Sequence, residues 1–232
     1  MHLSTVEAIL EYQVRTPSHF RFLLEAAHWP TQRIVSEQLS VWPPVELRTF
    51  EDRTSGNRHV RLDAAPGSLL VRYKADVEVH ALPVDDSLQE VPVSQVPDAV
   101  LPYLLPSRYC ESDVLSAFSR AKFGHMPPGI GRVRAVADWV RHGLAYRAGS
   151  TGSTTTARQA LEQGAGVCRD FAHVGIALCR ALNIPARLVA GYVFFDEPPQ
   201  DFHAIFEAWL YGRWVLFDPT RMAPVERLVR VG

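Results

Sequence analysis

The segment GAGVCRDFAHVGIALCRALNIP, residues 164–185, predicts a loop that continues into a helix. Two glycines, Gly164 and Gly166, permit tight backbone turns just before the cysteine. We expect the helix to run from about Cys168 to Leu182 and to end at the Asn-Ile-Pro that follows. Its apolar residues recur at the spacing of one helical face: Phe171, Val174, Leu178 and Leu182.

Cys168 stands at the start of this predicted helix. A free thiol has a pKa of about 8.5, and the unpaired N–H groups of a helix N-terminus favour its charged form. The backbone N–H of Cys168 is also a candidate oxyanion donor. A cysteine at a helix start is nevertheless more often a structural thiol. We expect that ordinary role for Cys179, inside the same helix, and for Cys110, in a loop with no base candidate beside it.

A nucleophilic cysteine needs a base and usually a group that orients the base. His203 begins an apolar run that a two-residue loop would join to the sequence RWVLFDP. Such a loop pairs Leu210 with Arg213, and it places Asp218 opposite Ile205, one diagonal step from His203 on the same face. Diagonal neighbours lie about 7–8 Å apart at Cα, within reach of a His–Asp hydrogen bond. A bulge or a three-residue loop would break this arrangement.

Two other side chains near this segment have competing interpretations. His173 is the histidine nearest to Cys168 in sequence, but five residues along a helix turn a side chain about 140° away. We therefore expect His173 to pack rather than to act as the base. Trp139 is a candidate second oxyanion donor, and the alternative that it only packs in its own helix is at least as good.

The sequences GAGVCRDFAHVGIALCRALNIPARLVAGY and DFHAIFEAWLYGRWVLFDPT resemble the catalytic core of the bacterial transglutaminase-like family. The upstream LLPSRYCESD is similar to that family's lead-in, so the resemblance covers about residues 100–220. It implies an α+β, papain-like core with Cys168 as nucleophile, His203 as base and Asp218 as the residue that orients the base. It also implies chemistry through an acyl-thioester, with no cofactor and no metal.

Members of that family differ in the acyl acceptor, which is water or an amine. The chain lacks the large extra domains of animal cross-linking enzymes, so we expect hydrolysis of a peptide, protein or small amide substrate by a cysteine peptidase-like enzyme. A cross-linking transglutaminase, a deamidase and a non-catalytic binding module on the same fold are the alternatives. A metal site built from Cys168, His173, His203 and Asp218 is a further one, but these residues lack the tight ligand spacing usual in structural zinc sites.

The first hundred residues predict short β-strands without a long helix. Pro17, Pro30, the Pro43-Pro44 pair and turn sequences such as TSGN and APGS separate the runs, which suggests an antiparallel sheet or a sandwich. A proline-rich joint follows, and we place the boundary there, with a β-rich domain at 1–104 and a catalytic domain at 105–232. The runs are ILEYQVR, HFRFLLEA, RIVSEQLSV, VELRTFED, HVRLDAA and SLLVRYKADVEVHAL.

Three helices are expected before the cysteine helix. SDVLSAFSRAKF has Ser112 or Asp113 available as N-cap, and GIGRVRAVADWVRHGLAY continues with a stripe of valines. TTTARQALEQG predicts a short helix that a threonine caps and Gly164 stops. Three β-runs are expected after the cysteine helix: ARLVAGYVFF, HAIFEAWL and RWVLFDP.

The balance of charged residues bears on which kinds of partner the protein can bind. The 232 residues include 24 Lys and Arg against 25 Asp and Glu, a net charge of −1 without a basic run. That balance argues against a nucleic acid or a membrane surface as partner. The N-terminal sequence resembles no secretory signal, and the three cysteines form no C-x-x-C pair. We therefore expect a cytoplasmic protein.

Overall fold

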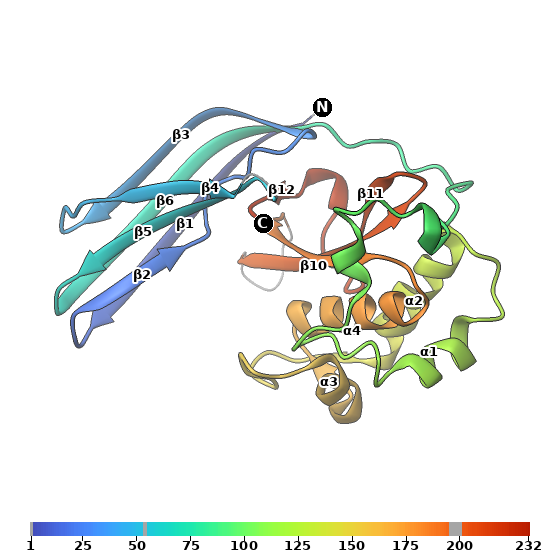
Figure 1. Cartoon of the computed structure of the whole chain (residues 1–232). Helices are drawn as coiled ribbons and strands as arrows, with labels where there is room; N and C mark the ends of the chain where they lie inside the picture. The colour runs from blue at the N-terminus through green and yellow to red at the C-terminus, as the bar shows by residue number, and fades with distance from the viewer. Residues whose placement is uncertain (1, 53–54, 195–200) are drawn as a thin grey trace. The chain divides into compact units, whose positions relative to one another are not determined.

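The computed structural model describes residues 2–52, 55–194 and 201–232 of the chain (Figure 1). The chain forms two compact units, and neither is one continuous stretch of sequence. Within the described residues no helix is long and apolar enough to cross a membrane. Unit 1 comprises Met1–Leu82, Ala190–Phe202 and Glu226–Gly232, and unit 2 comprises Pro83–Val189 and His203–Val225.

Unit 1 contains two three-stranded antiparallel sheets, which confirms the β-rich expectation. The first has the order β1-β6-β3, and the second has the order β2-β5-β4. Side chains of both sheets meet in one hydrophobic core, in which Val60, Leu62 and Tyr73 are fully buried. The strands are β1 (His2–Val14), β2 (Ser18–Phe22), β3 (Gln32–Trp42), β4 (Arg48–Asp52), β5 (Asn57–Ala64) and β6 (Gly67–Val79).

The first strand begins at His2, several residues before the run predicted from Ile9. Its early part alternates cleanly, since Ser4, Val6 and Ala8 are buried and the residues between them are exposed. Serine and alanine carry little apolar signal, so the inward face of this part is weakly marked in the sequence.

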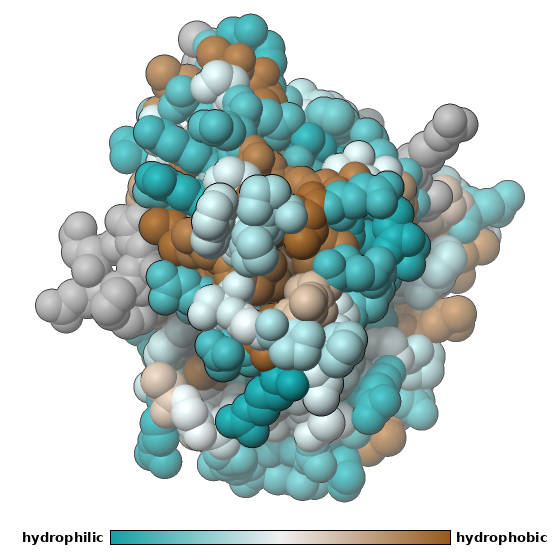
Figure 2. Space-filling view, turned by 90° about the vertical axis from the view of Figure 1, so that its left-hand side faces the viewer, coloured by the Kyte–Doolittle hydropathy of each residue, from teal (hydrophilic) through white to brown (hydrophobic). Residues whose placement is uncertain are grey.

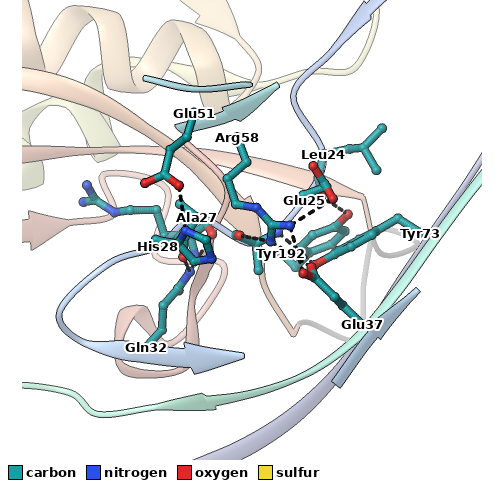
Figure 3. Close-up of polar contacts among 12 residues, drawn as sticks. Leu24, Glu25, Ala27, His28, Gln32, Glu37, Glu51, Arg58, Tyr73 and Tyr192 are labelled. Carbon is teal, nitrogen blue, oxygen red and sulfur yellow. Dashed lines mark hydrogen bonds and ion pairs between the residues drawn. The ribbon is translucent and has the colours of Figure 1, made fainter. Parts of the chain in front are cut away.

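A partly buried polar network lies inside unit 1 and centres on Arg58 (Figure 3). The guanidinium of Arg58 donates to both oxygens of Glu37, each at 2.8 Å, and to Glu25 at 3.1 Å. The hydroxyl of Tyr73 donates to Glu37 at 2.9 Å and accepts from the backbone N–H of Ala26 at 3.0 Å. Two carboxylates therefore share one guanidinium. Burial raises the pKa of Glu25 despite the nearby positive charge of Arg58.

Unit 2 is built around the helix that begins with the cysteine. This helix, α4, runs over Cys168–Ala181 as expected, and each of the other three helices contacts it. Helix α4 also approaches strand β10 (Phe202–Leu210) closely: a Cβ at Gly175 would lie 2.6 Å from the ring of Phe206. The helices are α1 (Ser116–Phe123), α2 (Ile130–Gly143), α3 (Ala157–Gln163) and α4.

The ends of two helices test the predicted capping residues. In α3, Thr156 forms a capping box with Gln159, and Gly164 adopts a left-handed φ of 66° at the C-cap, so both expectations are confirmed. The N-cap predicted for α1 is wrong: the helix begins at Ser116, and the cap residue Leu115 makes no side-chain capping bond. Ser112 is instead buried in a turn, where its N–H donates to the carbonyl of Cys110.

In unit 2 the sheet has the order β11-β10-β9. Strands β10 and β11 form the predicted hairpin, and Tyr211 and Gly212, with φ of 45° and 81°, make its two-residue turn. In unit 1 the end of β9 pairs with β12. The strands are β7 (Ala145–Tyr146), β8 (Ala165–Gly166), β9 (Ala186–Tyr192), β10 (Phe202–Leu210), β11 (Arg213–Phe217) and β12 (Val229–Arg230), and short 3-10 segments cover Val93–Gln95, Leu101–Leu104 and Val225–Arg227.

Candidate active site

Cys168 is the first residue of α4, and its side chain is partly buried. Burial by itself raises the pKa of this thiol. The hydrogen bond with His203 and the backbone N–H groups of Ala204 and Arg169 outweigh burial, so the net pKa is lowered. The sequence predicted that the helix start would favour the thiolate, and the structure adds the two backbone donors and the imidazole that face the sulfur.

His203 is 2% exposed and lies on β10 between the thiol and Asp218. Its Nε2 is 3.1 Å from Oδ2 of Asp218. Burial lowers the pKa of His203, but the hydrogen bonds to Asp218 and Cys168 raise it to a net value of about 9. Because Nε2 faces Asp218, Nδ1 is the ring nitrogen left to exchange a proton with the thiol.

Asp218 follows the end of β11 and is held in place by the chain that comes after it. Its Oδ1 accepts from both the backbone N–H and the hydroxyl of Thr220, at 2.9 and 2.7 Å. The N–H of Ala223 approaches Oδ2 at 3.3 Å. Burial by itself raises the pKa of Asp218. The hydrogen bonds from His203 and Thr220 outweigh burial, so the net pKa is lowered and the carboxylate stays ionised. Its lone pairs and its charge are thereby directed at the imidazole.

The hairpin register predicted from the sequence is confirmed. Leu210 pairs with Arg213 and Phe206 with Phe217, so the register continued by one step places Asp218 opposite Ile205. The hairpin therefore brings His203 and Asp218 together by the predicted route, and the imidazole of His203 also bonds the thiol of Cys168. The two pKa values nearest the sulfur move in opposite directions, that of the thiol down and that of the imidazole up. A thiolate beside an imidazolium is the state that these shifts favour.

The remaining candidates lie in other environments. His173 is 6% exposed and stacks on the ring of Tyr109 at 5.4 Å, and burial lowers its pKa to about 4. Burial raises the pKa of Cys110 to about 11 and also raises that of Cys179. The ring of Trp139 lies 5.2 Å from Phe118 and 6.2 Å from Phe123, contacts that agree with its packing alternative.

Competitive alkylation of the folded protein should label Cys168 first. Its thiolate is stabilised, whereas burial holds Cys110 and Cys179 in the thiol form. We expect the labelling rate of Cys168 to reach its plateau at a pH below the ordinary thiol pKa of about 8.5. The labelling rate of Cys110 should keep rising towards pH 11. Peptide mapping by mass spectrometry measures both rates. Faster labelling of Cys110 or Cys179 than of Cys168 would contradict the assignment.

Asp170 is a site residue that the sequence reasoning missed. This side chain is 1% exposed in the first turn of α4. One oxygen accepts from the backbone N–H of Val167 at 2.9 Å and from the hydroxyl of Thr151 at 2.5 Å, and the other accepts from Arg169 at 3.2 Å. It thus fixes the residue before Cys168 and the loop around Thr151. The signal in the sequence was an acidic residue at the third helical position, which is typical of a helix start.

The glycine at 166 makes this arrangement possible. A Cβ there would lie 2.6 Å from the Cβ of Asp170, closer than real contacts allow, and 3.0 Å from its Oδ2. The sequence predicted Gly166 as a turn residue. The structure shows that its missing side chain leaves room for the carboxylate that caps the helix start.

Replacing Asp170 by alanine should destabilise the protein by about 2 kcal/mol, because the N–H of Val167 and the hydroxyl of Thr151 lose a buried acceptor. Urea denaturation measures the change. Asp138→Ala is the matched control, since Asp138 pairs with Arg221 and is 46% exposed, and we expect a change of less than about 0.5 kcal/mol there. Equal losses of unfolding free energy in the two variants would contradict the stabilising role assigned to Asp170.

No group of three or more His, Cys, Asp or Glu side chains has the arrangement of a metal site in the residues that the structure describes.

Comparison with known proteins places these features in a family. Residues 117–219 match the transglutaminase-like superfamily, and residues 2–99 match the N-terminal domain of bacterial transglutaminases. A solved structure of a candidate cysteine protease from Cytophaga hutchinsonii is 40% identical, with a TM-score of 0.93, and the match covers 99% of this chain and 82% of that one.

Uncharacterized mycobacterial proteins are also similar. One from Mycobacterium leprae is 37% identical over 111 residues, which cover 43% of this chain and 38% of that protein. The chain thus matches less than half of that relative's length. One from Mycobacterium tuberculosis is 26% identical over 245 residues, which cover 94% of this chain and 78% of that protein. On the two domain matches and the Cytophaga structure, the chain belongs to the transglutaminase-like superfamily.

Proposed function

We propose that the protein is a cysteine-dependent acyl-transfer enzyme that hydrolyses peptide or amide bonds. The observation that carries this proposal is the hydrogen-bonded series Cys168–His203–Asp218, in which the pKa of the thiol is lowered and that of the imidazole is raised to about 9. A thiolate, a proton donor beside it and a carboxylate that orients the donor are the groups that acyl transfer requires.

The reaction follows from these positions. The thiolate of Cys168 attacks the carbonyl carbon, and the electron pair of the C=O bond moves to the oxygen. His203 then gives its proton to the leaving nitrogen as the C–N bond breaks and the thioester forms. A water molecule attacks the thioester while His203 takes its proton, and the carboxylic acid leaves as the thiolate returns. Asp218 holds the imidazole in one orientation and stabilises its charged form throughout.

The start of α4 supplies the donor for the oxyanion. The backbone N–H of Cys168 lies in the first turn of the helix, where N–H groups have no helical partner. A negative oxygen next to Cys168 is stabilised there by that donor and by the helix dipole.

Water as the acyl acceptor is supported by the similarity to the candidate cysteine protease from Cytophaga hutchinsonii. An amine acceptor would make the same thioester chemistry a cross-linking reaction, and a glutamine side chain as donor would make it a deamidation. Peptides, proteins and small amides are the substrate classes that fit. The three free cysteines agree with a reducing compartment, so we propose a cytoplasmic location, which cell fractionation tests.

Trapping the acyl-enzyme tests the proposal. The protein is mixed with a peptide library in the presence and absence of a labelled primary amine, quenched in acid and analysed by mass spectrometry. We expect an acyl adduct on Cys168 and free carboxylic acid products in both mixtures. Incorporation of the labelled amine would identify a cross-linking enzyme. The absence of any adduct, with Cys168 still open to alkylation, would favour a binding module.

A further inference from the structure

One face of the sheet β2-β5-β4 carries three arginines in a single row. In the strand register Arg21 pairs with Arg61, and Arg61 pairs with Arg48, so the three side chains stand on neighbouring strands of one face. All three are exposed, whereas Val60 and Leu62, on either side of Arg61 along β5, are fully buried on the opposite face. We call this set of three residues the arginine row. Positions so far apart in sequence gave no sign of it.

The arginine row is unfavourable without an anion, because like charges directly opposite each other repel. Within the described residues, neither Arg21 nor Arg61 forms an ion pair with a carboxylate. Their guanidinium groups donate to imidazoles instead: Nε of Arg61 bonds Nε2 of His19 at 3.0 Å, and Nε of Arg21 bonds Nδ1 of His59 at 3.3 Å. A face of this kind keeps cationic donors available to a ligand.

Among the described side chains, Asp63 is the carboxylate that contacts this row. It accepts from Arg48 at 2.6 Å and from Nδ1 of His19 at 2.5 Å. Nε2 of His19 accepts from Nε of Arg61, so this imidazole bridges Arg61 and Asp63 without adding a negative charge. Three guanidinium charges therefore face one carboxylate charge, and the row keeps an excess of positive charge.

We propose that the arginine row docks an acidic segment of a partner protein or peptide through its Asp and Glu side chains. A guanidinium presents its N–H groups as a planar fork that binds a carboxylate through two parallel bonds. Neighbouring strands lie about 4.8 Å apart, so one extended segment with spaced carboxylates reaches more than one guanidinium. This docking goes beyond the proposed acyl transfer and does not depend on Cys168.

Charge around the row favours discrete carboxylates over a continuous polyanion. Asp63 lies in the next row, and Asp52 follows on β4 on the same face as Arg48. The chain as a whole carries a net charge of −1. A nucleic acid or an anionic membrane presents closely spaced charges over a wide area and would meet these carboxylates as well. An acidic side chain can pair with one arginine and avoid them.

On the face drawn in Figure 2, hydrophobic side chains gather in a central patch that hydrophilic residues surround. Such patches are common on protein surfaces and do not by themselves identify a partner.

Binding of a fluorescein-labelled peptide of alternating Glu and Gly to the full chain, followed by anisotropy at low ionic strength, tests the proposal. We expect saturable binding that salt weakens, and a loss of about tenfold or more in affinity for Arg61→Gln and for Arg21→Gln. Arg33→Gln is the matched control, because Arg33 is an exposed strand arginine that already pairs with Glu78. It should bind as the unchanged protein does, and a peptide with Gln for Glu should not bind.

The melting temperatures of the same variants show whether weaker binding is caused by unfolding. Arg61→Gln removes a like charge from the row, so its melting temperature should equal or exceed that of the unchanged protein at low salt. If that variant unfolds, Arg61→Lys replaces it, and its weaker binding is expected because it keeps the charge without the fork. Equal affinity in all the variants would overturn the proposal. Tighter binding of single-stranded DNA, anionic vesicles or inorganic phosphate than of the acidic peptide would also overturn it.

Discussion

Replacing Cys168 by alanine is expected to lower kcat/KM by about 10⁴-fold or more. The thioester cannot form without the sulfur, and no other thiol of the chain combines a lowered pKa with an imidazole partner. His203→Ala should lose nearly as much, because the thiol and the imidazole act as a unit. The double variant should then be little worse than either single one. Steady-state kinetics on the substrate found by acyl trapping measures all three.

Two further variants separate the roles of the remaining residues. Asp218→Asn should keep a kcat/KM roughly ten to a hundred times higher than that of the nucleophile variant. The reason is that Asp218 only orients and stabilises His203. His173→Ala should change stability and leave turnover largely intact, since its ring stacks on Tyr109. If a stably folded His173→Ala protein were inactive while His203→Ala remained active, the assignment of the base would be wrong.

The pH profile of kcat/KM gives an independent check. Activity should rise as the pH passes the lowered pKa of Cys168, because the thiolate forms there. It should fall as the pH passes about 9, where His203 loses the proton that it gives to the leaving group. Asp218→Asn should move the alkaline limb to lower pH, since the carboxylate raises the pKa of His203.

The second large effect is expected in unit 1. Arg58→Met should destabilise the protein by about 3 kcal/mol near pH 8, because it leaves Glu25 and Glu37 without their shared partner. The side chain of Glu25 is only 8% exposed, so water cannot replace the guanidinium there. Urea denaturation measures the loss. Arg33→Met is the control, because Arg33 is 65% exposed and should change stability by less than about 0.5 kcal/mol.

The loss in Arg58→Met should shrink as the pH falls. Burial already raises the pKa of Glu25 in the folded protein, and removing Arg58 raises it further. The folded state then binds a proton more readily than the unfolded chain, so acidification restores stability. The double variant Glu25→Gln with Arg58→Met should likewise recover part of the loss. A loss that is independent of both pH and Glu25 would show that packing of Arg58, and not its charge, is what matters.

The parts of the site that the sequence predicted are those set by local geometry. A helix start at Cys168 follows from glycines and apolar spacing within one segment. The pairing of His203 with Asp218 follows from the length of one turn, because side chains alternate along a strand with a period of two. The start of β1 and the first turn of α1 were mistaken where weakly apolar or buried polar residues hide the pattern.

Features that depend on distant segments stayed hidden. The contacts of Asp170 with Thr151 join a helix to a loop that precedes it, and the arginine row unites three strands. The sequence also gave no reason to expect that residues 190–202 and 226–232 would join the first unit. The division of the chain at residues 104 and 105 stays a prediction about where it can be separated. Limited proteolysis in the proline-rich joint before residue 106 tests it.

The turn at Tyr211 and Gly212 has a consequence for sequence variation. It lies about 20 Å along the strand from Asp218. The side chain of Tyr211 is 75% exposed, so replacement by a residue that tolerates its left-handed φ, such as Asn or Gly, should be neutral. A change in length is different, because one inserted residue would turn every side chain of β11, and with it Asp218, to the opposite face. A relative with an odd-numbered insertion at this tip must therefore carry a compensating bulge before Asp218, or it has lost the third member of the triad. Inspection of loop length alone can sort relatives into those two groups.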